Sequence, residues 1–245
     1  MKRPAAADAV RAIAFPHAPL ALAGREPVAK GQDRFVYFSE DFPDLLFKAP
    51  QPLSTALRLA PGEKVSLTIA DLANFRRLTL KIAPGTLHRP FHKEMSCYLR
   101  TRLRGAETAE LPISNLFGFC DSDIGPVMAV ERVALPGEML GATLRRIISE
   151  GQFDPEKLAL LNQFTDRMFR YNVIAGDMTA ANIVFGQRDG VAQFVLIDGF
   201  GDIHAIPIRS LSWRLNRIAL VRSFQKLARR NGLHFDDNRL AFNLP

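Results

Sequence analysis

Two short apolar runs, residues 182–185 and 194–197, lie close together in the second half of the chain. The connector between them, residues 186–190, begins and ends with glycine and contains Asp189, a composition typical of turns. We therefore expect the two runs to form a β-hairpin.

The first half of the chain shows a similar pattern of short apolar and β-branched runs between turns. It predicts strands over residues 20–31, 34–39, 45–49, 115–120 and 127–133. Residues 50–90 interrupt the pattern with proline, glycine and polar residues. We expect an insertion there, with one short helix near 70–77 between extended segments.

Helical periodicity predicts three further segments, over residues 92–104, 143–149 and 156–171. In the first of them, an apolar stripe is formed by Met95, Tyr98, Leu99 and Leu103. The expected buried side of the last one consists of Leu158, Leu161, Phe164, Thr165, Met168 and Phe169.

Residues 203–235 contain no acidic residue, and arginine and lysine are interleaved there with large apolar side chains. This predicts one or two basic amphipathic helices, with four cations on a shared face: Arg222, Lys226, Arg229 and Arg230. One interpretation is a helix of the C-terminal lobe with a solvated basic face. The other is that residues 209–230 form a site for an anionic substrate or for an acidic membrane surface.

Composition narrows the class of protein only a little. The net charge of +7 favours an anionic partner without choosing among them. Cys97 and Cys120 form no closely spaced metal pattern and fit reduced cysteines of a cytoplasmic protein. No run approaches the roughly 18–20 apolar residues of a membrane span. Charges and prolines interrupt the alanine-rich N-terminal run, so we expect no secretory signal.

Polar residues flank the predicted hairpin in an order that suggests chemistry. Asp177 and Asn182 precede the first strand with the spacing Asp-x-x-x-x-Asn, and Asp198 follows the second strand. Taken singly, each residue could simply cap a turn. In this order, they favour the floor of a kinase-type site, with Asp177 as catalytic base and Asn182 and Asp198 as Mg²⁺ ligands.

The N-terminal strands supply candidates for ATP binding. A turn at Gly31 followed by a strand with Arg34 would cover the phosphates, and Lys48 on the third strand would contact them. Alternatively, Lys48 is a solvated lysine on an edge strand. Backbone groups of residues 130–133, those of Glu131 and Val133 among them, would face an adenine.

Glu94 lies in the first turn of the helix predicted over 92–104. It could complement the helix dipole there. The kinase-type interpretation makes it the ion-pair partner that orients Lys48.

A longer set of motifs resembles the YrbL family of PhoP regulatory network proteins, over about residues 28–232. The motifs are Phe-His-Lys-Glu94, Phe117-Gly-Phe119, residues 125–132, Asn182-Ile-Val-Phe185, Leu196-Ile-Asp198-Gly-Phe-Gly201 and the arginine-rich helix. The resemblance implies a small bacterial protein of protein-kinase-like fold, but no settled substrate. Compared with protein kinases, the glycine-rich turn is reduced and Ala175-Gly176 replaces His-Arg before Asp177.

We therefore expect an α+β, protein-kinase-like fold of two lobes. Residues 1–19 would be an extension, 20–135 an N-lobe with an antiparallel sheet, and 136–245 a small, mainly helical C-lobe. The expected activity is phosphoryl transfer from ATP to a non-peptide hydroxyl, because little chain follows Asp198 to hold a peptide. The alternative is a pseudokinase that senses nucleotide, which the reduced glycine turn favours. Nucleic-acid binding would rest on charge alone and is not expected.

Overall fold

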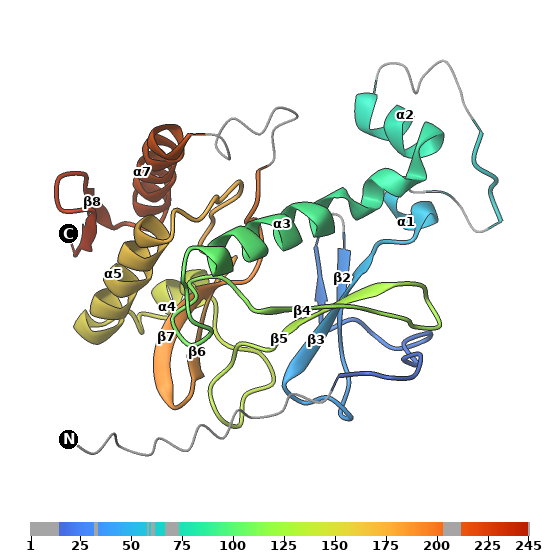
Figure 1. The fold of residues 1–245 in the computed structure, drawn as a ribbon, viewed down its shortest axis with the longest axis horizontal. Helices are drawn as coiled ribbons and strands as arrows, with labels where there is room; N and C mark the ends of the chain where they lie inside the picture. The colour runs from blue at the N-terminus through green and yellow to red at the C-terminus, as the bar shows by residue number, and fades with distance from the viewer. Residues whose placement is uncertain are drawn as a thin grey trace.

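The computed structural model describes residues 15–31, 34–57, 59, 62–66, 74–202 and 212–244. Five antiparallel strands form one sheet in the order β1-β2-β3-β5-β4 (Figure 1). They are β1 (Ala29–Lys30), β2 (Arg34–Phe38), β3 (Leu45–Pro50), β4 (Leu116–Cys120) and β5 (Val127–Glu131).

The alternation of side chains along β3 gives the sheet two different faces. Leu45, Phe47 and Ala49 pack on one face, together with Leu20 and Leu22. The intervening residues of β3 point to the other face, which is covered by the long helix α3 (Arg89–Leu103). Lys48 is therefore carried towards α3 by the same alternation that buries Phe47.

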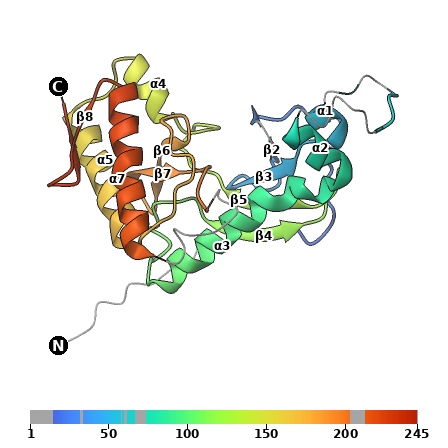
Figure 2. The ribbon, with the colours of Figure 1, turned by 90° about the horizontal axis from the view of Figure 1, so that it is seen from above.

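The rest of the described chain is mainly helical and lies on the other side of the molecule (Figure 2). Its elements are α4 (Leu144–Ser149), α5 (Pro155–Arg170), β6 (Ile183–Arg188), β7 (Val191–Leu196), α7 (Trp213–Arg230), β8 (His234–Asp236) and β9 (Ala241–Asn243). Phenylalanines 164, 169, 224, 235 and 242 hold α5, α7 and the β8–β9 pair together through a chain of ring contacts. Helix α3 extends from the sheet to this part, and the largest apolar core spans both.

Most of the predicted elements are present with small changes of boundary. The hairpin β6–β7 is confirmed, but its strands are longer than expected and only Asp189 and Gly190 connect them. The predicted strand over 20–31 is wrong except at Ala29–Lys30. The chain around Leu20 instead follows the turn after β4, where Leu20 bonds the backbone of Asp121 and Asp123.

The described part of the 50–90 segment is more helical than expected. It contains α1 (Leu53–Leu57), α2 (Phe75–Ile82) and the 3₁₀ helix η2 (Pro84–His88), which leads directly into α3. The extended segment expected directly after residue 77 is wrong, because Asn74 caps α2 and the helix continues to Ile82. Residues 70–73 of the predicted short helix lie outside the described residues.

The stripe predicted on α3 is also wrong in part. The helix buries Phe91, Glu94, Cys97 and Thr101, whereas Leu99 and Leu103 are 52% and 88% exposed. A helical period of 3.6 allows two neighbouring stripes on this sequence, and packing selects the one that includes Glu94. Because α3 begins at Arg89, Glu94 lies beyond the first turn, where a helix dipole has little effect.

Candidate functional site

Lys48 and Glu94 meet between the sheet and α3. Lys48 Nζ lies 3.1 Å from Glu94 Oε2, and both side chains are almost fully buried. Nζ also donates to the backbone oxygen of Ile197, at 2.7 Å. Strand β3, helix α3 and the end of the hairpin thus converge on one ammonium group.

Arg34 joins the same cluster from β2. Its two terminal nitrogens lie 2.7 Å from Glu94 Oε1 and 2.6 Å from Asp198 Oδ1. The guanidinium carbon is 5.6 Å from the centre of the Phe91 ring. Two cations and two carboxylates therefore alternate in the order Asp198, Arg34, Glu94, Lys48.

The two carboxylates respond differently to this arrangement. Burial raises the pKa of Glu94, and the charges of Lys48 and Arg34 only oppose the rise. Burial also acts to raise the pKa of Asp198, but here Lys48 and Arg34 prevail and the pKa is lowered. Asp198 is more accessible than Glu94, with a third of its side chain exposed. It is therefore an anionic ligand that solvent or a bound molecule can reach.

The loops before and after the hairpin are held together by their backbones. The backbone N–H groups of Gly176 and Asp177 both donate to Gly199 O, at 2.8 and 2.9 Å. Asn182 Nδ2 donates to Asp177 O at 3.0 Å. Gly199 has φ +76°, and a Cβ there would lie 2.3 Å from Asp177 O. Glycine at this position allows the loops to touch, which places Asp177, Asn182 and Asp198 at one end of the hairpin.

Within this group, Asp177 is exposed and Asn182 is partly exposed. Because Asn182 uses its amide nitrogen to hold the loop, its amide oxygen can face a ligand. The hard oxygen donors that suit Mg²⁺ are thus present at Asn182 and Asp198. Among the described residues, no three His, Cys, Asp or Glu side chains come together as a metal cluster.

Several backbone groups predicted to cover the phosphates or to face the adenine already form hydrogen bonds within the chain. The Gly31 N–H donates to Arg34 O at 2.9 Å, and residues 32–33 of this turn lie outside the described residues. The Glu131 N–H donates to Asn115 O, and Val133 O accepts from the Gly141 N–H. A nucleotide would therefore have to bind other backbone groups of the turn at Gly31 and of residues 130–133, or share the groups that already form these hydrogen bonds.

The side chain of Glu131 has a role that the sequence did not suggest. Arg188 at the end of β6 donates to both of its oxygens, at 2.7 and 2.6 Å. Arg188 also donates to the backbone oxygens of Leu111 and Ile113, and Asn115 donates to Glu131. Arg188 lies within the predicted connector 186–190, where an arginine gives no signal of burial, so only its place in the fold identifies this link.

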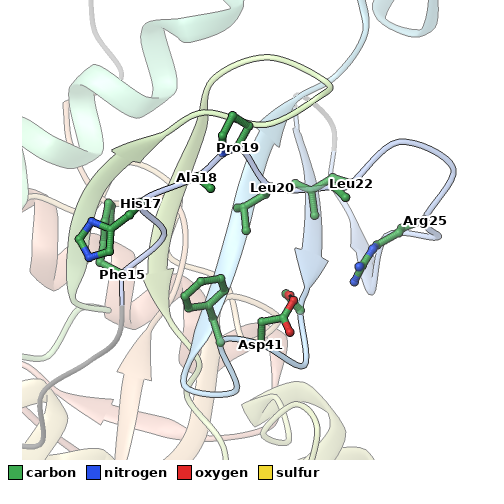
Figure 3. A pocket seen from close by; sticks show the side chains of 11 residues that line it. Phe15, His17, Ala18, Pro19, Leu20, Leu22, Arg25 and Asp41 are labelled. Carbon is green, nitrogen blue, oxygen red and sulfur yellow. The ribbon is translucent and has the colours of Figure 1, made fainter.

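A pocket of ≈ 570 Å³ lies elsewhere, on the far face of the sheet (Figure 3). It is lined by residues between Phe15 and Arg25 and by Ser39, Asp41 and Phe42. None of the predicted site residues lines it. The candidate site is instead the charged cluster beside α3 and the adjoining loops.

The family model described as PhoP regulatory network protein YrbL matches residues 20–232. A search of the curated proteins found no match. Within the described part of the chain, no helix combines the length and the apolar character that crossing a membrane requires.

Proposed function

This chain belongs to the family described as PhoP regulatory network protein YrbL, and we propose that it is a kinase-like phosphotransferase that uses ATP and Mg²⁺. The proposal includes a protein-kinase-like fold, with the five-stranded sheet and α3 as N-lobe and the helical part as C-lobe. The phosphate acceptor would be a non-peptide hydroxyl. Phosphoryl transfer depends on positioning and on charge stabilisation, so the arrangement of charges is the relevant test.

The buried Lys48–Glu94 pair beside Asp198 is the observation that carries the proposal. A lysine without a carboxylate partner would be costly to bury in this position. The ion pair with Glu94 holds the ammonium group of Lys48 at a defined point. That point adjoins Ile197, the residue before Asp198. A lysine oriented by a helix glutamate, next to a metal-binding aspartate, is the set of groups that kinases use to place the phosphates of ATP.

The residues present fit a magnesium ion. Asp198 is anionic and accessible, and Asn182 can offer its amide oxygen, while Mg²⁺ usually takes its other ligands from phosphates and water. Bound Mg²⁺ would supply charge neutralisation on the phosphates. The chain itself would hold the phosphates through Lys48, orient that lysine through Glu94, and accept the proton of the acceptor hydroxyl at the carboxylate of Asp177.

The exposure of Asp177 suits an acceptor that arrives from solvent or from a surface. Helix α7 begins only fifteen positions after Asp198, which leaves a short segment where protein kinases bind a peptide. We therefore favour the hydroxyl of a small molecule, a sugar or a lipid. We place the reaction in the cytoplasm, where the free Cys97 and Cys120 would stay reduced.

One observation favours a second function, that of a pseudokinase that binds nucleotide and regulates a partner. Arg34 occupies Asp198 in this structure, and the Gly31 N–H is used within its own turn. If Arg34 never leaves Asp198, a nucleotide could bind without a metal and without reaction.

The decisive experiment is a thermal unfolding series with ATP, with and without Mg²⁺. We expect ATP with Mg²⁺ to raise the midpoint, by an amount equivalent to about 2.7 kcal/mol when ligand is at a hundredfold excess over Kd. The shift should disappear in Asp198→Asn. Asp189→Asn is the matched control, because Asp189 is an exposed turn residue far along the hairpin, and it should keep the shift.

The outcomes separate the two functions. A shift that depends on Mg²⁺ and on Asp198, with turnover reduced about 10²–10⁴-fold in Asp177→Asn, supports the phosphotransferase. Turnover that survives in Asp177→Asn contradicts the role of that residue as base. A shift with ATP alone, unchanged in Asp198→Asn, favours the pseudokinase. Absence of any shift rejects nucleotide binding.

A further inference from the structure

Helix α7 presents a face that the fold does not use. Its inward side packs into the main core through Asn216, Leu220, Phe224, Leu227 and Ala228. The opposite side carries Leu215, Ile218, Arg222, Lys226 and Arg229, at intervals of three and four residues. We call these five residues the outward face. They lie along one line of the helix, and α7 lies at the outside of the molecule beside α5 (Figure 2).

The first part of this surface is apolar although it faces solvent. Leu215 and Ile218 are 47% and 49% exposed, and Trp213 at the start of the helix is 56% exposed. The guanidinium of Arg217 lies 5.8 Å from the Trp213 ring and 5.3 Å from the ring of Phe169. The tryptophan is thus held against the protein by a cation–π contact on the side of α7 opposite Leu215, and it does not belong to the outward face.

The second part of the outward face is cationic, and no carboxylate of α7 balances its charge. Helix α7 contains no Asp or Glu, and Arg230 adds to the charge of the outward face. None of these cations forms an ion pair with a carboxylate in the part of the chain that the structure describes. Asp237 is close to the helix, but it accepts a hydrogen bond from Gln225.

We propose that the outward face of α7 binds the surface of an anionic lipid bilayer. Exposed leucine and isoleucine suit the boundary between head groups and acyl chains, and the cations suit lipid phosphates. Nucleic acid would match the cations but leaves Leu215 and Ile218 without a partner. This combination of groups on one helix face selects the lipid surface.

The same helix is anchored to the loop that leads to the candidate site. Asn216 is buried, and its Nδ2 donates to the backbone oxygen of Val173 at 3.0 Å. Val173 is four residues before Asp177. A bilayer bound to α7 would therefore hold the protein by an element that is joined directly to this loop. The membrane binding itself does not depend on phosphotransferase activity.

The test is co-sedimentation of the protein with lipid vesicles. The full-length protein is titrated with vesicles of phosphatidylcholine alone and with vesicles that also contain phosphatidylglycerol. With the anionic vesicles we expect co-sedimentation that weakens as salt rises. With phosphatidylcholine alone we expect no binding.

Two variants assign the binding to the outward face. Since each cation near an anionic surface strengthens binding about fivefold, Arg222→Glu/Lys226→Glu/Arg229→Glu should weaken it by ~100-fold or more. Leu215→Ser/Ile218→Ser should also reduce the affinity for the anionic vesicles. A control of equal charge change, Arg25→Glu/Lys64→Glu/Arg145→Glu, alters exposed cations elsewhere and should bind better than the first variant.

Unfolding midpoints show whether each variant is folded before its binding is compared. The proposal is overturned if the α7 and control variants lose binding equally. It is also overturned if RNA binds and anionic vesicles do not. Concentration-dependent self-association in the absence of lipid, lost in Leu215→Ser/Ile218→Ser, would instead assign this face to a second copy of the chain.

Discussion

Arg34 is the residue on which the electrostatics of the candidate site depend. It is buried and bridges Glu94 and Asp198, which come from opposite sides of the cluster. Without it, Lys48 alone would face two carboxylates. Arg34 also occupies an oxygen that a metal ion would need, so it has to move if Asp198 is to bind Mg²⁺.

Replacing Arg34 by Met should raise the pKa of Asp198, because burial would then be opposed mainly by Lys48. In the wild type this pKa lies below its ordinary value of 3.8. Asp198 therefore stabilises the fold above that pH, and the contribution is lost as the pH falls through the folded pKa. The variant should lose this acid-sensitive contribution. At neutral pH it should also lose stability, but less than the ~3–5 kcal/mol of an unpaired buried charge, because Lys48 still pairs with Glu94.

The measurements are the carboxyl ¹³C titration of Asp198 and urea unfolding between about pH 3 and pH 7. This range begins about one pH unit below the ordinary pKa of an aspartate and ends at neutrality. Arg25→Met is the control, since Arg25 is an exposed arginine away from the cluster. An Asp198 pKa that is the same in both variants and the wild type would show that Arg34 does not control this carboxylate.

At the scale of elements, the loop after the hairpin supports α3. The Gly201 N–H donates to Ile174 O at 2.7 Å, and a Cβ on Gly201 would lie 2.7 Å from Lys93 O. Lys93 immediately precedes Glu94. The position of Glu94 relative to Lys48 thus depends on a loop that must pass α3 without a side chain.

We expect Gly201→Ala to destabilise the fold and to weaken any binding that requires the Lys48–Glu94 pair. Gly201 has φ +103°, so alanine adds backbone strain of about 1–3 kcal/mol and, in addition, a clash with α3. Gly190→Ala is the matched control, because Gly190 has φ +79° and open space around its Cβ position. Urea unfolding and the thermal shift with ATP and Mg²⁺ measure both effects. Equal losses in the two variants would show that the contact with α3 does not matter.

At the scale of the molecule, Arg188 connects the hairpin with the end of strand β5 in the sheet. Its side chain is 5% exposed and bonds Glu131 of β5 together with the backbone of residues 111 and 113. The hairpin carries Asn182 and Asp198 near its ends, while the sheet carries Lys48. This ion pair therefore helps to determine how the two halves of the candidate site face each other.

Arg188→Met should cost about 3–5 kcal/mol of unfolding free energy, because it leaves Glu131 buried without its partner. Arg188→Met/Glu131→Gln should cost less than the sum of the two single changes, since the residues interact directly. The exposed pair Arg146–Glu150 provides the control, and Arg146→Met should change stability by no more than about 0.5 kcal/mol. Urea denaturation measures the wild type and all four variants: Arg188→Met, Glu131→Gln, the double variant and Arg146→Met. Additive single changes would mean that Arg188 and Glu131 do not stabilise each other.

Local structure could be predicted from sequence wherever one pattern dominated. The helices α4 and α5 begin after the residues that cap them, Thr143 and Asp154, and the hairpin strands differ from their turn in composition. Prediction from the pattern failed where two local structures fitted the sequence about equally well. On α3 the choice between neighbouring stripes depends on what the helix packs against, and near residue 80 β-branched residues lie in a helix that Asn74 caps.

The sequence by itself determined which groups could do chemistry and how they are spaced: Asp177 and Asn182 before a hairpin, Asp198-Gly after it, Lys48 on a strand and Glu94 on a helix. Local spacing suffices for this, because turns and strands depend on near neighbours. Only the tertiary structure decided which charges meet, since ion pairs join residues far apart in sequence. It placed Arg34 on Asp198 and Glu131 on Arg188, because buried charges must find partners wherever the chain brings them together.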